Sequence, residues 1–221
     1  MGGEGSLLEH GTRYERDDPG FDRAIGFVDA TYALALTLLV TTLDVDDLPT
    51  AWSSVGSLFD AIGAQFLAFG IAFVVIANYW LAHHRMIAAF GALDYPTIVV
   101  NLLLVGAIVL LPFSTQSVGD PSVVDLALPT VVMTLNVAAC SILHSCVFAL
   151  AVRRGLLARR RPPEEVRGYL VLSMVPAVVF LASIPIAYAV SADAARISWL
   201  ALLVVNPIVG KIVERNQPSP G

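Results

Sequence analysis

A few polar and ionisable side chains interrupt long apolar stretches of this sequence. Asp29 lies in the first stretch, His83, His84 and Arg85 stand together at the end of the second, and Asn101 lies near the start of the third. A carboxylate in the middle of a membrane helix costs on the order of 2.5 to 3.5 kcal/mol, so each such group requires a partner. Groups of these types could form an interhelical hydrogen-bond network, a metal site or a proton relay.

Depth along the expected helices indicates that these residues share one layer. Asp29 lies about two turns into the first helix, and Asn101 lies just over one turn into the third. Tyr79 and Trp80 fall in the same layer and offer a phenol and an indole N–H, or else form a routine aromatic belt. We expect a packing network in which Asp29 meets His84 or Arg85 and Asn101 joins them. The alternative is that separate side chains extend to the membrane surface.

Metal binding and catalysis have little support in the sequence. His83 and His84 point about 100° apart on a helix, and no cysteine, or histidine or glutamate at i, i+4, accompanies them, which disfavours a zinc site. No Ser/His/Asp set, P-loop or HExxH pattern occurs. We therefore predict that the chain is not an enzyme, has no cofactor and binds no nucleic acid.

Membrane-spanning helices are the elements that must position these side chains. Of the 221 residues, 57% are apolar and 14% are charged, which a water-soluble fold could not accommodate. Six stretches are long and apolar enough to cross about 30 Å of hydrocarbon. They span residues 24–43, 55–81, 96–117, 126–152, 170–190 and 197–213. The prediction is an all-α membrane protein without a separate soluble domain: a polar tail at 1–22, a membrane domain at 23–213 and a C-terminal tail at 214–221.

The distribution of basic residues predicts the orientation of these helices. With the N-terminus inside, 12 of the 13 basic residues lie on the inner side and Arg196 alone lies outside. Both termini are then cytoplasmic, as six spans require. Because all basic residues except Lys211 are arginine, the composition indicates a GC-rich bacterial genome, and we expect a multi-pass protein of a bacterial inner membrane.

Two charged regions allow more than one interpretation. The arginine run at 153–161 could bind the head groups of anionic membrane lipids, but it also suffices as a topological anchor. Acidic residues in the outer loops could concentrate cations near an outer mouth, or could simply translocate freely. These residues are Asp44, Asp46, Asp47, Asp120 and Asp193.

The first helix carries a stripe of leucine and threonine. At 100° per residue, Leu34, Thr37, Leu38 and Thr41 fall within about 100° of one another, whereas Asp29 lies about 140° from Leu34. The carboxylate therefore faces neighbouring helices, whereas the leucine and threonine stripe lies on a different face of the same helix. From periodicity alone, ordinary helix packing explains such a stripe better than a pore does.

Three motifs resemble the transmembrane protein 175 family of endolysosomal potassium channels and their prokaryotic relatives. Arg23, Phe27 and Asp29 in RAIGFVD resemble the R-x-x-x-F-S-D signature of the family's first helix, with Val28 in place of the serine. The sequence NYWLAHHR at 78–85 is similar to Y-W-x-x-H-H-R at the end of its second helix.

The third motif completes the resemblance in the same chain order. The sequence NLLLVGAIVLLPFST at 101–115 resembles the N-L-L-x-L…P-F-x-T pattern of the family's third helix. The resemblance implies a tetramer of six-helix subunits, a central pore lined by the first helix, and conduction of monovalent cations that favours potassium. No TVGYG filter is implied, and the sequence contains none.

Residue roles follow from the resemblance by position. The hydrophobic constriction falls on Leu34, with Leu38 as the next inward-facing candidate, and the threonine layer falls on Thr37 and Thr41. The motif residues are implied to join the first helix to its neighbours. They are Arg23, Phe27, Asp29, Trp80, His83, His84, Arg85 and Asn101.

Two rival functions stay open beside a potassium-permeable channel. One is a proton-coupled secondary transporter that uses Asp29 and His84, and the other is a non-conducting structural membrane protein. Pro176 and Pro185 interrupt the fifth helix, but the sequence shows no second, inverted half and no carboxylate at mid-membrane.

Overall fold

The computed structural model describes residues 13–43, 48–120 and 122–215. Within these ranges six helical stretches are long and apolar enough to cross a membrane. They are Pro19–Thr42, Val55–Ala88, Tyr95–Gly119, Ala127–Arg153, Pro163–Ala189 and Ala192–Arg215. The predicted all-α fold with six spans is therefore confirmed. Residues 1–12 and 216–221 of the predicted tails, and Asp44, Asp46 and Asp47 of the outer loop, lie outside the described residues.

Each span consists of one helix or of a helix with a short continuation. The elements are β1 (Arg13–Glu15), α1 (Pro19–Leu38), η1 (Leu39–Thr42), α2 (Leu48–Ala51), α3 (Val55–Ala88), β2 (Ala92–Asp94), α4 (Tyr95–Val109), α5 (Leu111–Gly119), α6 (Ala127–Arg153), α7 (Pro163–Ala189), α8 (Ala192–Ser198), η2 (Trp199–Ala201) and α9 (Leu202–Arg215).

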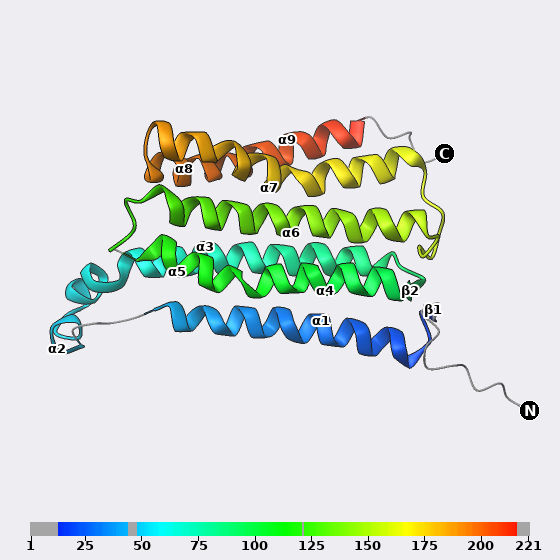
Figure 1. Cartoon of the computed structure of the whole chain (residues 1–221), viewed down its shortest axis with the longest axis horizontal. Helices are drawn as coiled ribbons and strands as arrows, with labels where there is room; N and C mark the ends of the chain where they lie inside the picture. Colours follow the sequence, from blue (N-terminus) through cyan, green and yellow to red (C-terminus); the bar gives the residue numbers. More distant parts are fainter. Residues whose placement is uncertain (1–12, 44–47, 121, 216–221) are drawn as a thin grey trace, which may run out of the picture.

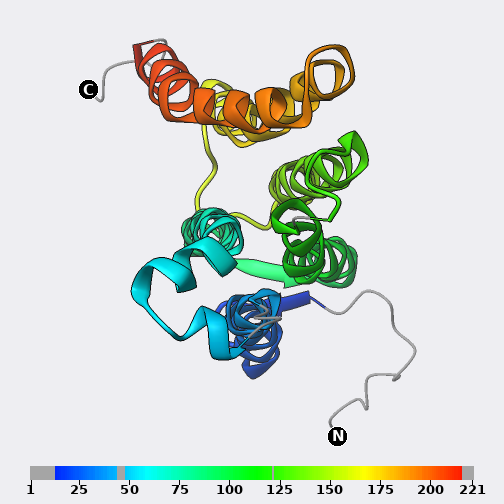
Figure 2. The same cartoon turned by 90° about the vertical axis from the view of Figure 1, so that its left-hand side faces the viewer.

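The long helices lie side by side along one axis (Figure 1). The start of α1 and the end of α9 lie at the same end of the bundle, as an even number of spans requires. Viewed along the helices, α1 occupies one edge of the subunit, α7 and α9 occupy the opposite edge, and α3, α4 and α6 lie between them (Figure 2). The helix α1 thus has neighbours on one side only.

Three spans begin five to seven residues earlier than hydropathy predicts, because polar capping residues and first turns extend the apolar stretches. The Asp18 carboxylate accepts a hydrogen bond from the Gly20 backbone N–H at 2.7 Å, and Pro19 occupies the first turn, so α1 begins within the predicted N-terminal tail. Likewise α7 begins at Pro163 rather than at 170, and α8 at Ala192 rather than at 197.

Proline divides the third span. The helix α4 ends at Val109 and α5 begins at Leu111, directly before Pro112, whose ring and missing N–H disrupt the helical ladder. In α7, by contrast, Pro176 and Pro185 are accommodated within one continuous helix. Neighbouring helices can compensate the backbone groups that such prolines free.

A small sheet closes the end of the bundle at which α1 begins, and it was not predicted. Strands β1 and β2 pair antiparallel, with Tyr14 opposite Leu93. Asp94 follows directly and caps α4 by accepting from the Thr97 N–H at 3.0 Å, and it forms an ion pair with Arg154. The segment after α6 is thereby tied to the start of α4.

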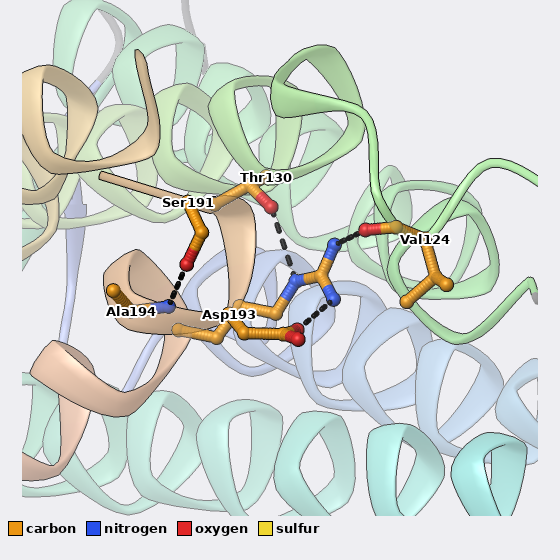
Figure 3. Close-up of polar contacts among 6 residues, drawn as sticks. Val124, Thr130, Ser191, Asp193 and Ala194 are labelled. Atoms are coloured by element: carbon orange, nitrogen blue, oxygen red, sulfur yellow. Dashed lines mark hydrogen bonds and ion pairs between the residues drawn. The ribbon is translucent and has the colours of Figure 1, made fainter. Parts of the chain in front are cut away.

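Arg196 holds the opposite end of the bundle together (Figure 3). Its Nε donates to the Thr130 hydroxyl at 3.1 Å, one terminal nitrogen donates to Asp193 at 2.9 Å, and the other donates to the Val124 carbonyl. The one basic residue predicted on the outer side therefore links the start of α8 to α6 and to the loop that precedes it.

Candidate functional site

One face of α1 packs into the subunit. Val28, Tyr32, Ala35 and Leu39 are buried and follow a helical spacing of four, three and four residues. This face meets α3 and α4, and Tyr32, Ala35 and Leu39 have almost no exposed surface. Packing inside one subunit therefore uses a stripe different from the leucine and threonine stripe.

The other face of α1 is uncovered within the subunit and holds all four predicted pore residues. Leu34 is 54% exposed and Leu38 is 37% exposed, and Thr37 and Thr41 are exposed beside them. Ordinary packing within the subunit, which periodicity alone favours, does not explain this stripe. Lipid, another subunit or a pore must contact it.

Arg23 and Phe27 lie on this exposed face and not in the predicted network around Asp29. Counted from Leu34, they fall at about −20° and +20° at 100° per residue, so they continue the same stripe toward the start of α1. Phe27 is 58% exposed, and Arg23 is exposed as well. The role that the resemblance implies for these two residues, joining the first helix to its neighbours, stays a prediction.

Asp29 pairs with a different residue from those predicted. Its carboxylate accepts a hydrogen bond from the Trp80 indole N–H of α3 at 3.0 Å, and the Trp80 ring lies 5.6 Å from that of His84. The expected pairing of Asp29 with His84 or Arg85 is wrong, because Trp80 precedes His84 by one turn on the same face of α3 and reaches the carboxylate first. Arg85 is exposed.

His83 and Asn101 form a second contact, which is buried. His83 Nε2 lies 3.0 Å from the Asn101 amide oxygen, and both residues are buried. Since an amide oxygen only accepts, Nε2 carries the proton. The Tyr32 ring lies 5.7 Å from that of His83. The predicted layer therefore exists as two contacts, Asp29 with Trp80 and His83 with Asn101, each between α3 and a neighbouring helix.

Two tyrosines extend this layer, Tyr79, which was expected in it, and Tyr32, which was not. The Tyr79 hydroxyl lies 2.6 Å from that of Ser141 and donates to the Val137 carbonyl at 3.0 Å, which connects α3 to α6. Tyr32 is buried on the packed face of α1, and its hydroxyl has no partner among the described residues. The signal that marks Tyr32 is its spacing of four residues from buried Val28. Within the described ranges, no cluster of three His, Cys, Asp or Glu residues could hold a metal ion.

The threonines present oxygen atoms along the exposed face. Thr37 donates its hydroxyl proton to the Ala33 carbonyl at 2.9 Å, and Thr41 donates to the Leu38 carbonyl at 2.7 Å. A hydroxyl that donates to its own helix keeps lone pairs that can still accept. The stripe therefore combines apolar leucine surface with oxygen ligands suited to a hard cation.

Comparison with known proteins identifies the first half of the chain. The family described as endosomal/lysosomal potassium channel TMEM175 matches residues 23–112. The matched residues, fewer than half of the 221 in the chain, are those that hold the sequence motifs of the first three helices. A curated potassium channel of Streptomyces collinus is 30% identical over 101 residues, which are 44% of this chain and 47% of that protein. The chain thus matches about half the length of this curated relative.

The likeness in fold extends further than the likeness in sequence. The crystal structure of a lysosomal potassium-selective channel TMEM175 homolog from Chamaesiphon minutus matches with a TM-score of 0.70 at 20% identity. The match covers 86% of this chain and 98% of that one. All three motifs recognised in the sequence begin inside the matched residues 23–112.

Proposed function

We propose that this protein is a potassium-permeable cation channel of a bacterial inner membrane, formed by four copies of the chain. Residues 23–213 form the channel domain. The match to the TMEM175 family and the likeness to the Streptomyces and Chamaesiphon potassium channels support the choice of ion. The cation itself is the permeant ligand, and no further cofactor is required.

The observation that carries this proposal is the uncovered leucine and threonine stripe on α1. Leu34, Thr37, Leu38 and Thr41 are exposed within the subunit while the opposite face of the same helix is buried. One helix cannot enclose a pore, but rotational symmetry brings the same face of several copies around one axis. Four copies of α1 arranged in this way turn their stripes toward a shared central path.

Leu34 and Leu38 form the constriction in this arrangement. A leucine ring returns no hydrogen bonds to an ion that has lost water, so it blocks conduction by narrowing and dewetting. Thr37 lies between these two levels and Thr41 lies beyond them, and their free lone pairs can replace part of the ion's hydration shell. Apolar rings would thus gate the pore, and hydroxyl oxygens would favour cations.

The polar layer holds α1 in position rather than conducting ions. Asp29 faces Trp80 on α3, away from the stripe, and the buried pair of His83 and Asn101 joins α3 to α4. The bond between Asp29 and Trp80 fixes the rotation of α1 against α3 and so fixes which face α1 presents to the axis. This arrangement disfavours a proton relay through Asp29 and His84, since the Asp29 carboxylate already accepts a hydrogen bond from the Trp80 indole N–H.

Two measurements on the purified protein test the proposal. Native mass spectrometry should give four copies of the chain, and a monomer as the only species would contradict it. Liposomes containing the protein should release potassium down its own gradient when a protonophore collapses any proton gradient. Potassium movement that stops under protonophore would instead indicate proton-coupled transport, and no movement at all would favour the structural role.

A further inference from the structure

A groove lies between α7 and α9, on the edge of the subunit farthest from α1. Its volume is about 1280 Å³. The walls carry aliphatic side chains, with Val175, Val178 and Val179 on α7 and Val205 and Val209 on α9. None of these residues takes part in the contacts that position α1, so the groove serves another purpose than shaping the α1 face.

Arginines gather at the end of this groove formed by the α6–α7 connection. Arg153, Arg160, Arg161 and Arg167 all line it. Arg161 is paired with Glu165 at 3.2 Å. In the part of the chain that the structure describes, no acidic side chain pairs with Arg153, Arg160 or Arg167. One end of the groove is therefore strongly basic, while the walls beyond it are apolar.

We propose that this groove binds one anionic phospholipid. Its phosphate is held by Arg153, Arg160 and Arg167, because guanidinium groups match phosphate oxygens in a bidentate geometry. One of its acyl chains lies along the valines of α7 and α9. Basic pockets between membrane helices on the cytoplasmic side bind anionic head groups, and the arginine-rich connection is predicted to lie on that side.

The dimensions of the groove fit this ligand better than they fit the alternatives. From Pro163 to Val179 the lining runs along α7 for about 24 Å at 1.5 Å per residue, more than the roughly 15 Å of one hydrocarbon leaflet. A free phosphate would leave this apolar length unfilled. A helix of another subunit would have to bury three unpaired arginines, which is costly without acidic partners.

Native mass spectrometry of the full chain in detergent can test the site with defined lipids. Phosphatidylglycerol should bind at least tenfold more tightly than phosphatidylcholine with the same acyl chains. Each arginine near an anionic head group contributes roughly fivefold to binding, so Arg160→Gln with Arg167→Gln should weaken phosphatidylglycerol binding by about 25-fold. Arg159→Gln is the matched control, because Arg159 is exposed in the same connection but does not line the groove.

A second pair of variants tests the acyl-chain part of the site. Val205→Trp should fill the groove and prevent phosphatidylglycerol binding, whereas Ile208→Trp, on an exposed part of α9 outside the lining, should not. Equal retention of the two lipids, or equal weakening by Arg159→Gln, would overturn the proposal. Displacement of the lipid by inorganic phosphate would also overturn it. So would a Val205→Trp protein that no longer forms oligomers, whether or not lipid is added.

Discussion

Replacing Trp80 with phenylalanine tests whether its hydrogen bond holds α1 against α3. The change removes the indole N–H that donates to Asp29 at 3.0 Å and keeps an aromatic ring beside His84. Hydrogen bonds between membrane helices average about 0.6 kcal/mol and reach about 1.7 kcal/mol. Because a carboxylate oxygen is a stronger acceptor than a hydroxyl oxygen, we expect a loss near the upper end, about 1.5 kcal/mol of unfolding free energy.

Trp199 supplies the matched control. Its indole N–H donates to the Ser183 hydroxyl at 2.9 Å, a bond of similar length to a neutral acceptor. Trp199 is buried and Trp80 is half-buried, so the lost ring surface costs Trp199→Phe more, and only the hydrogen-bond contributions are compared. Trp199→Phe should lose about 0.6 kcal/mol through its hydrogen bond, about 1 kcal/mol less than Trp80→Phe loses through its own.

Unfolding by sodium dodecyl sulfate in mixed micelles, followed by circular dichroism, measures both free energies under one condition. A double-mutant cycle with Asp29→Ala should show that Trp80 and Asp29 are coupled. Additive effects of Trp80→Phe and Asp29→Ala in the cycle would refute the role assigned to this bond. Asp29→Ala that remains fully stable yet loses potassium selectivity would place Asp29 in the pore instead.

Three further predictions concern the ends and the core of the subunit. Burial raises the pKa of Asp94, but hydrogen bonds and charge from Thr97 and Arg154 outweigh burial and hold the pKa below its ordinary value. The resulting stabilisation is complete above pH 4 and is lost as pH falls through the lowered pKa. Asp94→Asn should therefore be less stable than the parent at pH 7, by up to about 1 kcal/mol, and should approach it in thermal scans below pH 4. Asn101→Leu should lower the unfolding free energy by about 1 to 3 kcal/mol, because it leaves buried His83 without its acceptor. A substitution by valine elsewhere on α4 should not lower it by as much. Leu39→Ala should cost about 2 to 5 kcal/mol in the same unfolding assay and leave the flux per folded channel unchanged, because Leu39 is fully buried on the packed face of α1.

The six helices could be predicted because each needs about 20 apolar residues to cross the bilayer. Three of their starts could be placed from hydropathy within one residue, and three could not, since caps such as Asp18 and first turns such as that after Pro163 are polar. The pairing of β1 with β2 was also missed. The two strands have three residues each and lie far apart in the chain. Three residues are too few for an alternation of apolar and polar side chains to be recognised as a strand.

The site was predictable where it depends on helical period and not where it depends on contacts between helices. The angle between Asp29 and Leu34 follows from 100° per residue, and in the structure the two residues do lie on different faces. Trp80 and His84 share one face of α3, so the choice between them depends on how far α1 is shifted along α3. Hydropathy does not specify that shift, and for this reason the partner of Asp29 was predicted wrongly.

The most direct test of the α1 pore is potassium flux through liposomes carrying Leu34→Asn. Leu203→Asn is the control, because Leu203 is also an exposed leucine but lies on α9, at the opposite edge of the subunit. A polar side chain at the constriction lowers the barrier to a hydrated ion, so Leu34→Asn should raise the initial rate several-fold at matched protein amounts, and Leu203→Asn should match the parent. If Leu34→Asn conducts no faster than the parent, or if Leu203→Asn changes the rate as much, then the exposed face of α1 does not line the pore.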